Sequence, residues 1–229
     1  MQSPKLKIIY EDDDILVIDK PAGINVLSLI KLLSKKYPNL RKVHRLDKDT
    51  SGILLIAKNN KSLIFLQEQF KQRRVEKRYT ALVIGTLKDN QGEIKTLIGR
   101  NPKNRKKQKV FLRGEPGSKG KREAITEYRV IEKSKDCTLV EVKIKTGRKH
   151  QIRCHFSYLG YPLAGDKKYE FKNQLCPEEL NRQFLHASYL KIKLPNGKIK
   201  EFHSNLPEDL KEVLKKLCLQ KLKYSIKNN

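Results

Sequence analysis

Residues 44–57 join two contrasting runs of sequence: the polar run His44-Arg45-Leu46-Asp47-Lys48-Asp49-Thr50-Ser51-Gly52 and the apolar run Ile53-Leu54-Leu55-Ile56-Ala57. The apolar run is short and aliphatic, which predicts a buried strand over Gly52–Lys58. The polar run is rich in turn-forming residues and predicts a loop that leads into this strand. Asp47 therefore lies in a loop at a strand end, between basic residues.

Asp47 is open to several roles from these residues alone. A carboxylate in such a loop could be a nucleophile, a general base or a metal ligand. An Asp near Thr, Ser and Gly more often caps a turn through its side-chain oxygen. The loop is a candidate site whose chemistry its own residues do not decide.

The rest of the chain mixes strand and helix patterns. Alternating or apolar runs predict strands at Leu6–Tyr10, Ile15–Asp19, Arg78–Gly85, Ile125–Ile131, Thr138–Thr146, Phe184–Leu194 and Lys198–His203. Apolar residues at helical spacing and helix start signals predict helices that end near Lys36, cover Ser62–Gln72 and Lys149–Leu159, and begin near Pro207. The mixture agrees with a fold of the α/β (α+β) class.

The charge of the chain is strongly positive. Its 229 residues contain 51 Lys and Arg against 25 Asp and Glu, a net charge of +26. Such an excess repels itself in the compact state, so it favours a polyanionic partner, and nucleic acid is the leading one. The alternative is a lysine-rich proteome that raises the charge without any function.

The sequence argues against membrane and secreted classes of protein. No apolar run approaches the roughly 18 residues that a membrane helix needs. The four cysteines show no Cys-x-x-Cys pair, and no secretion signal precedes them. We expect a cytoplasmic protein with reduced thiols.

The segment Arg100–Arg122 has an unusual composition. It holds ten Lys or Arg against the single acid Glu115, together with several Gly and Pro residues. This predicts a long basic loop that is mobile when free, which either grips RNA or is a solvated linker. Four of its residues, called the loop cations below, are candidates for RNA contacts: Lys103, Arg105, Lys106 and Lys107.

Two further blocks combine basic residues with an aromatic or glycine residue. Lys77–Val83 holds Tyr79 on a predicted strand, where a Tyr is usually part of the core but can also stack on a nucleobase. Thr146–His155 joins a glycine turn to a basic helix start, which predicts an anion site at Arg148 and Lys149, or a solvated basic face. The spacing of His150, Cys154 and His155 does not form a convincing tetrahedral set, so no metal is expected.

Together these blocks resemble the RluA family of RNA pseudouridine synthases. The resemblance begins with Tyr10–Gly23, continues through His44–Gly52 and Lys77–Val83, and ends with Thr146–His155, Gly160–Asp166 and Phe184–Ala187. It spans about residues 8–210, and its motifs are long, ordered and specific. Departures are small: Leu27 and Ser28 stand where relatives often have a His, and Glu170 stands where a Gly is common.

The resemblance implies a fold and a domain organisation. The expected fold is a mixed, largely antiparallel β-sheet flanked by helices. The expected organisation is a single catalytic domain over residues 1–229, with a core over about 8–219 and no separate N-terminal RNA-binding domain.

The resemblance also implies roles for individual residues. Asp47 is the essential carboxylate, Tyr79 stacks on the target base, and Arg153 is the cation that faces Asp47, with Arg148 as the alternative. From its place in the loop, and not from the resemblance, Arg45 is expected to fill the gap that the flipped uridine leaves in the RNA. The remaining expected contacts are RNA contacts by His44, Arg148 and Lys149 and apolar pocket walls from Ile152 and Leu185.

The implied activity is isomerisation of uridine in ribosomal or transfer RNA. The reaction involves no redox change, so no cofactor is expected, and a monomer is the default state. Two rivals stay open: a non-catalytic RNA-binding protein that retains the fold, and another enzyme with an Asp nucleophile such as a nucleoside glycosylase.

Overall fold

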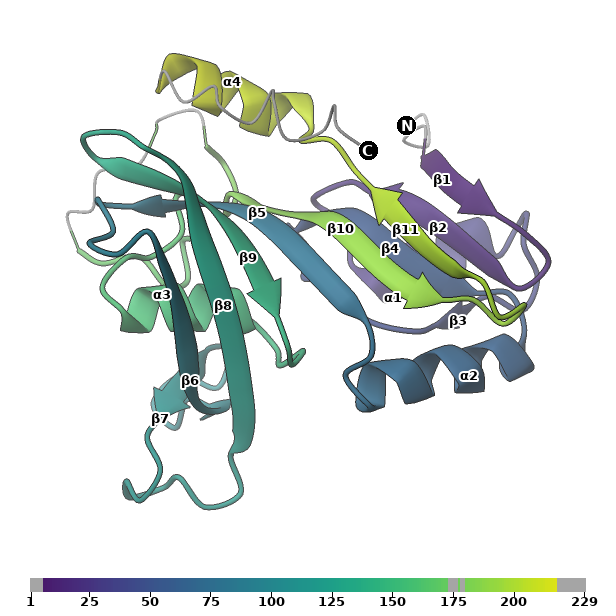
Figure 1. The fold of residues 1–229 in the computed structure, drawn as a ribbon, viewed down its shortest axis with the longest axis horizontal. Coiled ribbons are helices and arrows are strands. Elements are labelled where there is room, and N and C mark those ends of the chain that lie inside the picture. The colour runs from purple at the N-terminus through teal and green to yellow at the C-terminus, as the bar shows by residue number, and fades with distance from the viewer. Residues whose placement is uncertain (1–5, 173–176, 178–179, 218–229) are drawn as a thin grey trace. The chain divides into compact units, whose positions relative to one another are not determined.

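A computed structural model describes residues 6–172, 177 and 180–217 (Figure 1). In chain order its elements are β1 (Lys7–Glu11), β2 (Ile15–Lys20), α1 (Val26–Leu33), β3 (Arg41–Lys42), β4 (Ser51–Ala57), α2 (Asn60–Lys71), β5 (Glu76–Ile84), β6 (Gln91–Arg100), β7 (Gln108–Phe111), β8 (Arg122–Lys133), β9 (Cys137–Ile144), α3 (Gln151–Tyr158), β10 (Leu185–Lys193), β11 (Ile199–His203) and α4 (Glu208–Lys216). The chain forms two compact units. The first contains residues up to Lys77 and His186–Leu206, and the second contains Arg78–Leu185 and the residues from Pro207 onward.

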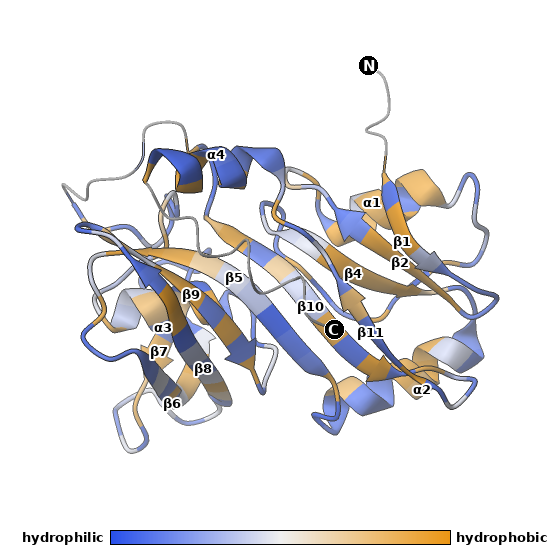
Figure 2. Ribbon diagram, turned by 45° about the horizontal axis from the view of Figure 1, so that its top comes forward, coloured by the Kyte–Doolittle hydropathy of each residue, from blue (hydrophilic) through white to orange (hydrophobic). Residues whose placement is uncertain are grey.

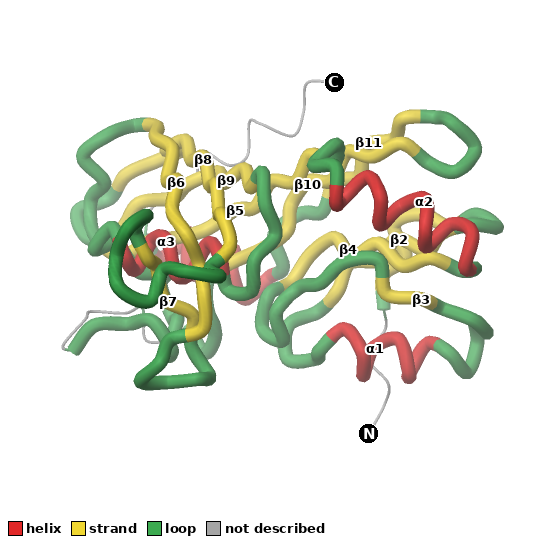
Figure 3. Tube along the Cα trace, turned by 90° about the horizontal axis from the view of Figure 1, so that it is seen from below, coloured by secondary structure: helices red, strands yellow, loops and turns green. Residues whose placement is uncertain are grey.

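The strands of the first unit form a mixed sheet in the order β1-β2-β4-β10, with β3 paired to β4 and β11 paired to β10. Most pairs are antiparallel, but β10 runs parallel to β4, with His186 opposite Ser51 and Ala187 opposite Gly52. Helix α1 packs against β3, and helix α2 packs against β3 and β4 (Figure 3). The predicted mixed sheet with flanking helices is confirmed.

The core of the first unit is built around β4. Every residue of this strand is buried, and Figure 2 shows the hydrophobic colour along it. Burial on both faces is why the strand reads as a continuous apolar run rather than an alternating one. Leu66 of α2 is buried in the same cluster, and Leu63 and Phe70 pack against it, as the helical spacing predicts.

The strands of the second unit follow the order β5-β9-β8-β6-β7, and every neighbouring pair is antiparallel. The predicted hairpin is present as β8 and β9, with a bulge between Val130 and Glu132. Helix α3 packs against β7 and β8. The amphipathic face predicted for the last helix is also present, since Leu210, Val213 and Leu214 of α4 are buried.

The prediction of an uninterrupted loop over Arg100–Arg122 is wrong in its middle. Residues 108–111 form β7, which pairs with the end of β6. Strand β6, which pairs with β8 along eight residues, was not predicted. Only Ile94 and Ile98 of β6 are buried, so its apolar signal is weak, and strand pairing rather than local pattern makes it a strand.

Two further findings bear on the class of protein. Among the described residues, no helix is both long and apolar enough to cross a bilayer. Cys137 and Cys154 are buried, while Cys176 and Cys218 lie outside the described residues. The single catalytic domain over residues 1–229 stays a prediction.

Candidate active site

The Asp47 loop joins β3 to β4 in the first unit. The Thr50 amide donates to the Asp47 carbonyl (3.2 Å), which closes a tight turn. The Asp47 side chain is only 14% exposed, and its Oδ1 lies 3.8 Å from Nη2 of Arg45, whose side chain is 54% exposed. The loop thus presents a largely buried carboxylate beside a cation that reaches solvent.

Lys20, at the end of β2, holds this loop from inside. Its side chain is fully buried, and its ammonium donates to the carbonyls of Pro21 (2.7 Å), Ile24 (2.9 Å) and Lys48 (3.0 Å). An ammonium has three N–H donors, and three carbonyls match them. Because the Lys48 carbonyl directly follows Asp47 in the chain, Lys20 fixes the backbone that carries the Asp47 side chain.

The start of β4 is locked to β10 by a buried hydrogen-bond chain and a close backbone approach. Ser51 Oγ lies 3.0 Å from His186 Nδ1, and His186 Nε2 lies 3.1 Å from the Ser204 carbonyl. A carbonyl only accepts, so Nε2 carries the proton and Nδ1 accepts from Ser51. Gly52 has a φ of +110°, and a Cβ there would lie 2.3 Å from the Ala187 carbonyl oxygen. Only glycine allows this approach.

His44 is a structural part of the loop. Its Nε2 accepts from the Leu55 amide (2.9 Å), and its ring stacks on Phe70 with centroids 5.0 Å apart. Burial, with the charge of Lys77 nearby, lowers the His44 pKa to about 3, and burial lowers the Lys77 pKa to about 8. His44 is therefore neutral at neutral pH. The RNA contact of His44 stays a prediction, and an uncharged imidazole ring would make it.

Tyr79 lies on β5 in the second unit. It pairs with Val142 of β9, and the residue is only 8% exposed. Ile152 and Leu185, the predicted apolar walls, are buried as well. Their common role around a base stays a prediction.

Arg153 projects from α3 and forms a buried, two-point ion pair with Asp166. Its Nε donates to Asp166 Oδ2 (2.6 Å) and its Nη2 to Asp166 Oδ1 (2.7 Å), with the two side chains 6% and 0% exposed. This fork fixes the plane of the guanidinium and uses two of its five N–H donors. That Arg153 also faces Asp47 stays a prediction. The motif Gly160–Asp166 contains Asp166, but no role was predicted for this residue from the sequence.

Tyr169 also lies beside Arg153. Its ring centroid lies 5.3 Å from the Arg153 guanidinium carbon. Its hydroxyl accepts from the Gln108 amide (2.7 Å) and lies 3.0 Å from His150 Nδ1. Burial raises the Tyr169 pKa above its usual range, so the phenol stays protonated and bridges β7 and the start of α3.

A buried polar network fastens α3 to the sheet of the second unit. His155 bridges Thr126 of β8 (2.8 Å) and Thr96 of β6 (3.0 Å), and burial lowers its pKa to about 4. Gln151 donates to the Ile125 carbonyl (2.9 Å) and accepts from the Arg148 amide (3.0 Å). His150 and His155 are thus engaged in internal contacts.

The predicted phosphate contacts lie at the surface of the second unit. Lys149 is exposed, while Arg148 Nε donates to the Glu123 carbonyl (2.8 Å), which ties this cation to β8. The loop cations follow β6 in an ordered turn, where Asn101 Oδ1 accepts from the amides of Lys103 (2.9 Å) and Asn104 (3.2 Å). The described residues hold no cluster of three metal-ligating side chains.

Comparison with known proteins gives the family. The sequence profile described as RNA pseudouridylate synthase matches residues 14–158, a range that includes Asp47, Tyr79 and Arg153. The chain belongs to the RNA pseudouridylate synthase family. The prediction of an RNA pseudouridine synthase of the RluA type, an isomerase, is confirmed.

Relatives from several bacteria agree with this assignment. The uncharacterized RNA pseudouridine synthase YlyB of Bacillus subtilis is 38% identical over 93% of this chain and 73% of its own length. The ribosomal large subunit pseudouridine synthase D of Nitrosomonas europaea is 38% identical over 91% of this chain, which spans 64% of that relative. The solved structure of human RNA pseudouridylate synthase domain containing 4 has a TM-score of 0.79 at 27% identity, covering 93% of this chain and 94% of that one.

Proposed function

We propose that this pseudouridine synthase isomerises specific uridines in structured ribosomal RNA, with transfer RNA as the alternative substrate. Relatives that carry the name ribosomal large subunit pseudouridine synthase C or D, 36–38% identical to this chain, support the ribosomal substrate. The observation that carries the proposal is the family match across residues 14–158. The same proposal includes a cytoplasmic, monomeric enzyme that needs no cofactor or metal.

In this proposal Asp47 is the essential carboxylate. The reaction breaks the bond between N1 of uracil and C1′ of ribose, turns the base, and forms a bond from C5 to C1′. The proton on C5 is then lost and N1 gains one. A covalent carboxylate intermediate would divide this exchange into easier steps. The low exposure of Asp47 supports this role, because a carboxylate with little water around it interacts strongly with a reacting group.

Tyr79 and Arg153 complete the proposed catalytic set. Tyr79 would stack on the target base and assist proton transfer. Arg153 would provide the cation that keeps the Asp47 carboxylate ionised. Its buried fork with Asp166 supports this role, because a guanidinium held in one plane keeps its positive charge at a fixed place.

RNA binding would supply the energy for base flipping. A uridine in a stacked helix must leave the stack to be isomerised, at a cost of a few kcal/mol. The net charge of +26 provides phosphate contacts that can offset this cost. Arg45, which is more than half exposed beside Asp47, would occupy the space that the uridine leaves.

The experiment maps pseudouridine across total RNA from cells with and without this protein, with a carbodiimide primer-stop readout. We expect the loss of one or a few sites, restored by the wild type and by Asp49→Asn but not by Asp47→Asn. Asp49 is the matched control because it is a carboxylate of the same loop. Purified Asp47→Asn should bind the target RNA with nearly wild-type affinity.

Two outcomes would contradict the proposal. Substantial turnover by Asp47→Asn would remove the carboxylate mechanism. An unchanged map, joined with no turnover by purified enzyme on transcribed ribosomal and transfer RNAs, would favour a non-catalytic RNA-binding protein.

A further inference from the structure

A pocket of about 360 Å³ opens on the second unit at β7, the end of α3 and residues 168–171. Its size falls within the range of about 300–1,000 Å³ that is usual for small-ligand sites. Neither Tyr79 nor Arg153 lines it. The pocket is therefore distinct from the residues that are proposed to act on the uridine.

Exposed apolar side chains gather at this pocket. The described residues contain nine large hydrophobic side chains that are exposed, and three of them line the pocket: Leu112 (44%), Tyr158 (50%) and Phe171 (48%). Such a grouping on a surface usually marks a binding site. Two of the three are aromatic, and aromatic faces at a surface can stack on nucleobases.

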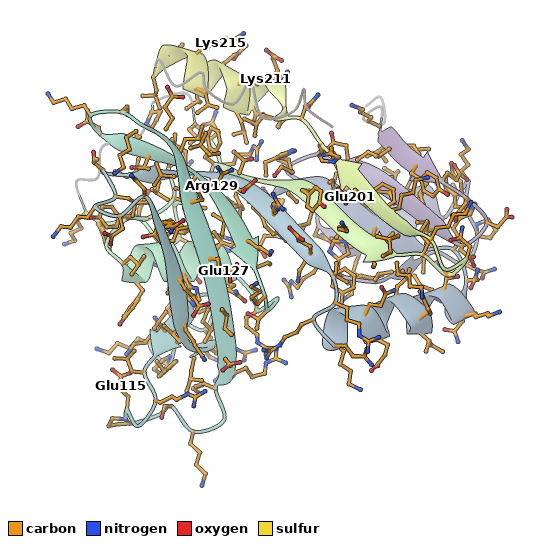
Figure 4. All side chains as sticks on the ribbon, in the orientation of Figure 1. Glu115, Glu127, Arg129, Glu201, Lys211 and Lys215 are labelled. Atoms are coloured by element: carbon orange, nitrogen blue, oxygen red, sulfur yellow. The ribbon has the colours of Figure 1, made fainter. Side chains whose placement is uncertain are left out.

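The same pocket is lined by charged side chains. Lys107, Lys109 and Lys168 line the pocket. Its carboxylates are Glu115, which lies in the loop that follows β7 (Figure 4), and Glu170. The Glu115 carboxylate accepts from the Leu112 amide (2.9 Å) and so serves the loop itself. The lining is positive overall and suits an anion.

The pocket is held in shape by internal contacts. Besides the bond from Gln108, Tyr169 receives a hydrogen bond at its carbonyl from Ser157 Oγ (3.0 Å). The lining of the pocket also contains Val110 and Cys154, which are buried in one apolar cluster with Tyr169. A preformed site loses less free energy on binding than one that must first be ordered.

We infer that this pocket binds one nucleotide of single-stranded RNA, outside the uridine that reacts. The base stacks against Tyr158 and Phe171, and its phosphates contact Lys107, Lys109 and Lys168. The combination of a basic groove and stacking side chains is how proteins bind single strands without reading their sequence. This inference rests on the proposed function, because it takes RNA as the polymer that the enzyme binds.

The test measures fluorescence anisotropy of a labelled oligoadenylate of six nucleotides with the full chain. This probe contains no uridine and so cannot be a substrate. Replacing Phe171 or Tyr158 by Ala should weaken binding by roughly 5- to 150-fold, the range for one lost base stack. Phe171→Trp should retain the affinity, and Phe65→Ala, at an exposed aromatic residue of α2, is the matched control.

The cation contribution is tested by Lys109→Gln. The slope of log affinity against log salt should fall by about 0.7 for a lost phosphate contact to a single strand. Lys211→Gln, on α4 (Figure 4), removes the same charge outside the pocket and should leave the slope near the wild-type value.

A photoreactive 8-azidoadenosine in the probe places the bound base directly. Adducts on the pocket lining, within residues 107–115 or 157–171, support the inference, and adducts confined to other peptides overturn it. Equal affinities of the Phe171, Tyr158 and Phe65 variants would also overturn it. Pseudouridine mapping with wild-type enzyme tests the proposed function separately, so a failed pocket with an active enzyme is distinguishable from a failed function.

Discussion

Asp166→Asn is the substitution whose effect the structure predicts most sharply. It preserves the size of the side chain but removes the charge that balances Arg153. An amide can still accept one hydrogen bond from the guanidinium, but its NH₂ group then faces the second arm of the fork, donor against donor. Both side chains are almost completely buried, so water cannot replace the lost acceptor.

The expected loss of stability is large. Breaking a buried ion pair by removing one partner costs about 3–5 kcal/mol, because the other charge stays buried without compensation. A typical domain has only about 5–15 kcal/mol of total stability. At about 2–4 °C per kcal/mol for a chain of this size, Tm should fall by roughly 6–20 °C.

Urea unfolding and pseudouridine formation on the target RNA should be measured together on three proteins. Asp166→Asn should be destabilised and inactive. Arg153→Met combined with Asp166→Asn should recover part of the lost stability, since no buried charge is then left without a partner. The double variant should remain inactive, because the proposed catalytic cation is gone.

Two results would refute this reasoning. If Asp166→Asn unfolds within about 1 kcal/mol of the wild type, the pair does not carry the expected energy. If the double variant regains activity, Arg153 is not the cation of the reaction, and its role is to hold α3 in place.

Gly52→Ala should unfold the protein or strongly destabilise it, because the added Cβ would overlap the Ala187 carbonyl. The control is Gly197→Ala: Gly197 also has a positive φ, +86°, but has open space around it, so this substitution should cost only about 1–2 kcal/mol. Comparable losses of stability for both variants would contradict the steric argument. Acid should destabilise the fold, because below pH 6.5 the unfolded state protonates His44 and His155 while the folded state resists until about pH 3 and 4. The free energy of unfolding should fall by up to about 1.4 kcal/mol per pH unit for each His. The measurement is the free energy of unfolding between pH 6.5 and 4. If His155→Asn leaves the slope of this curve unchanged, His155 does not contribute to it. Replacing the loop cations with Gln should weaken RNA binding and reduce its salt slope by about 0.7–0.9 per lost phosphate contact, whereas an unchanged slope would show that this turn does not grip RNA.

Strong local patterns made much of the fold predictable. The aliphatic run of β4 and the alternation in β9 were recognisable as strands from the sequence. Burial on both faces of a strand produces a continuous apolar run, and burial on one face produces alternation. β6 and β7 lack such patterns. β7 has only four residues, and it is a strand because it pairs with the end of β6, which precedes it in the chain across the basic turn.

The candidate site divides in the same way. Motifs located Asp47, Tyr79 and Arg153 by residue type and order. They did not reveal what holds these side chains, because the partners are distant in sequence. Lys20 meets the Lys48 carbonyl across 28 residues, and Asp166 meets Arg153 across 13. Such pairs follow from the path of the backbone, which no single segment encodes.

The lysines of this chain use their positive charge in two ways, and Lys20 differs from the others. Most lysines of the described residues are exposed and would react with an acylating reagent, whereas Lys20 is enclosed and its ammonium donates to three carbonyls. Graded acylation should therefore erase the affinity for RNA well before it disturbs the backbone beside Asp47. If Asp47 is the reacting carboxylate, as proposed, the binding of RNA and the geometry of the catalytic loop are chemically separable in this protein.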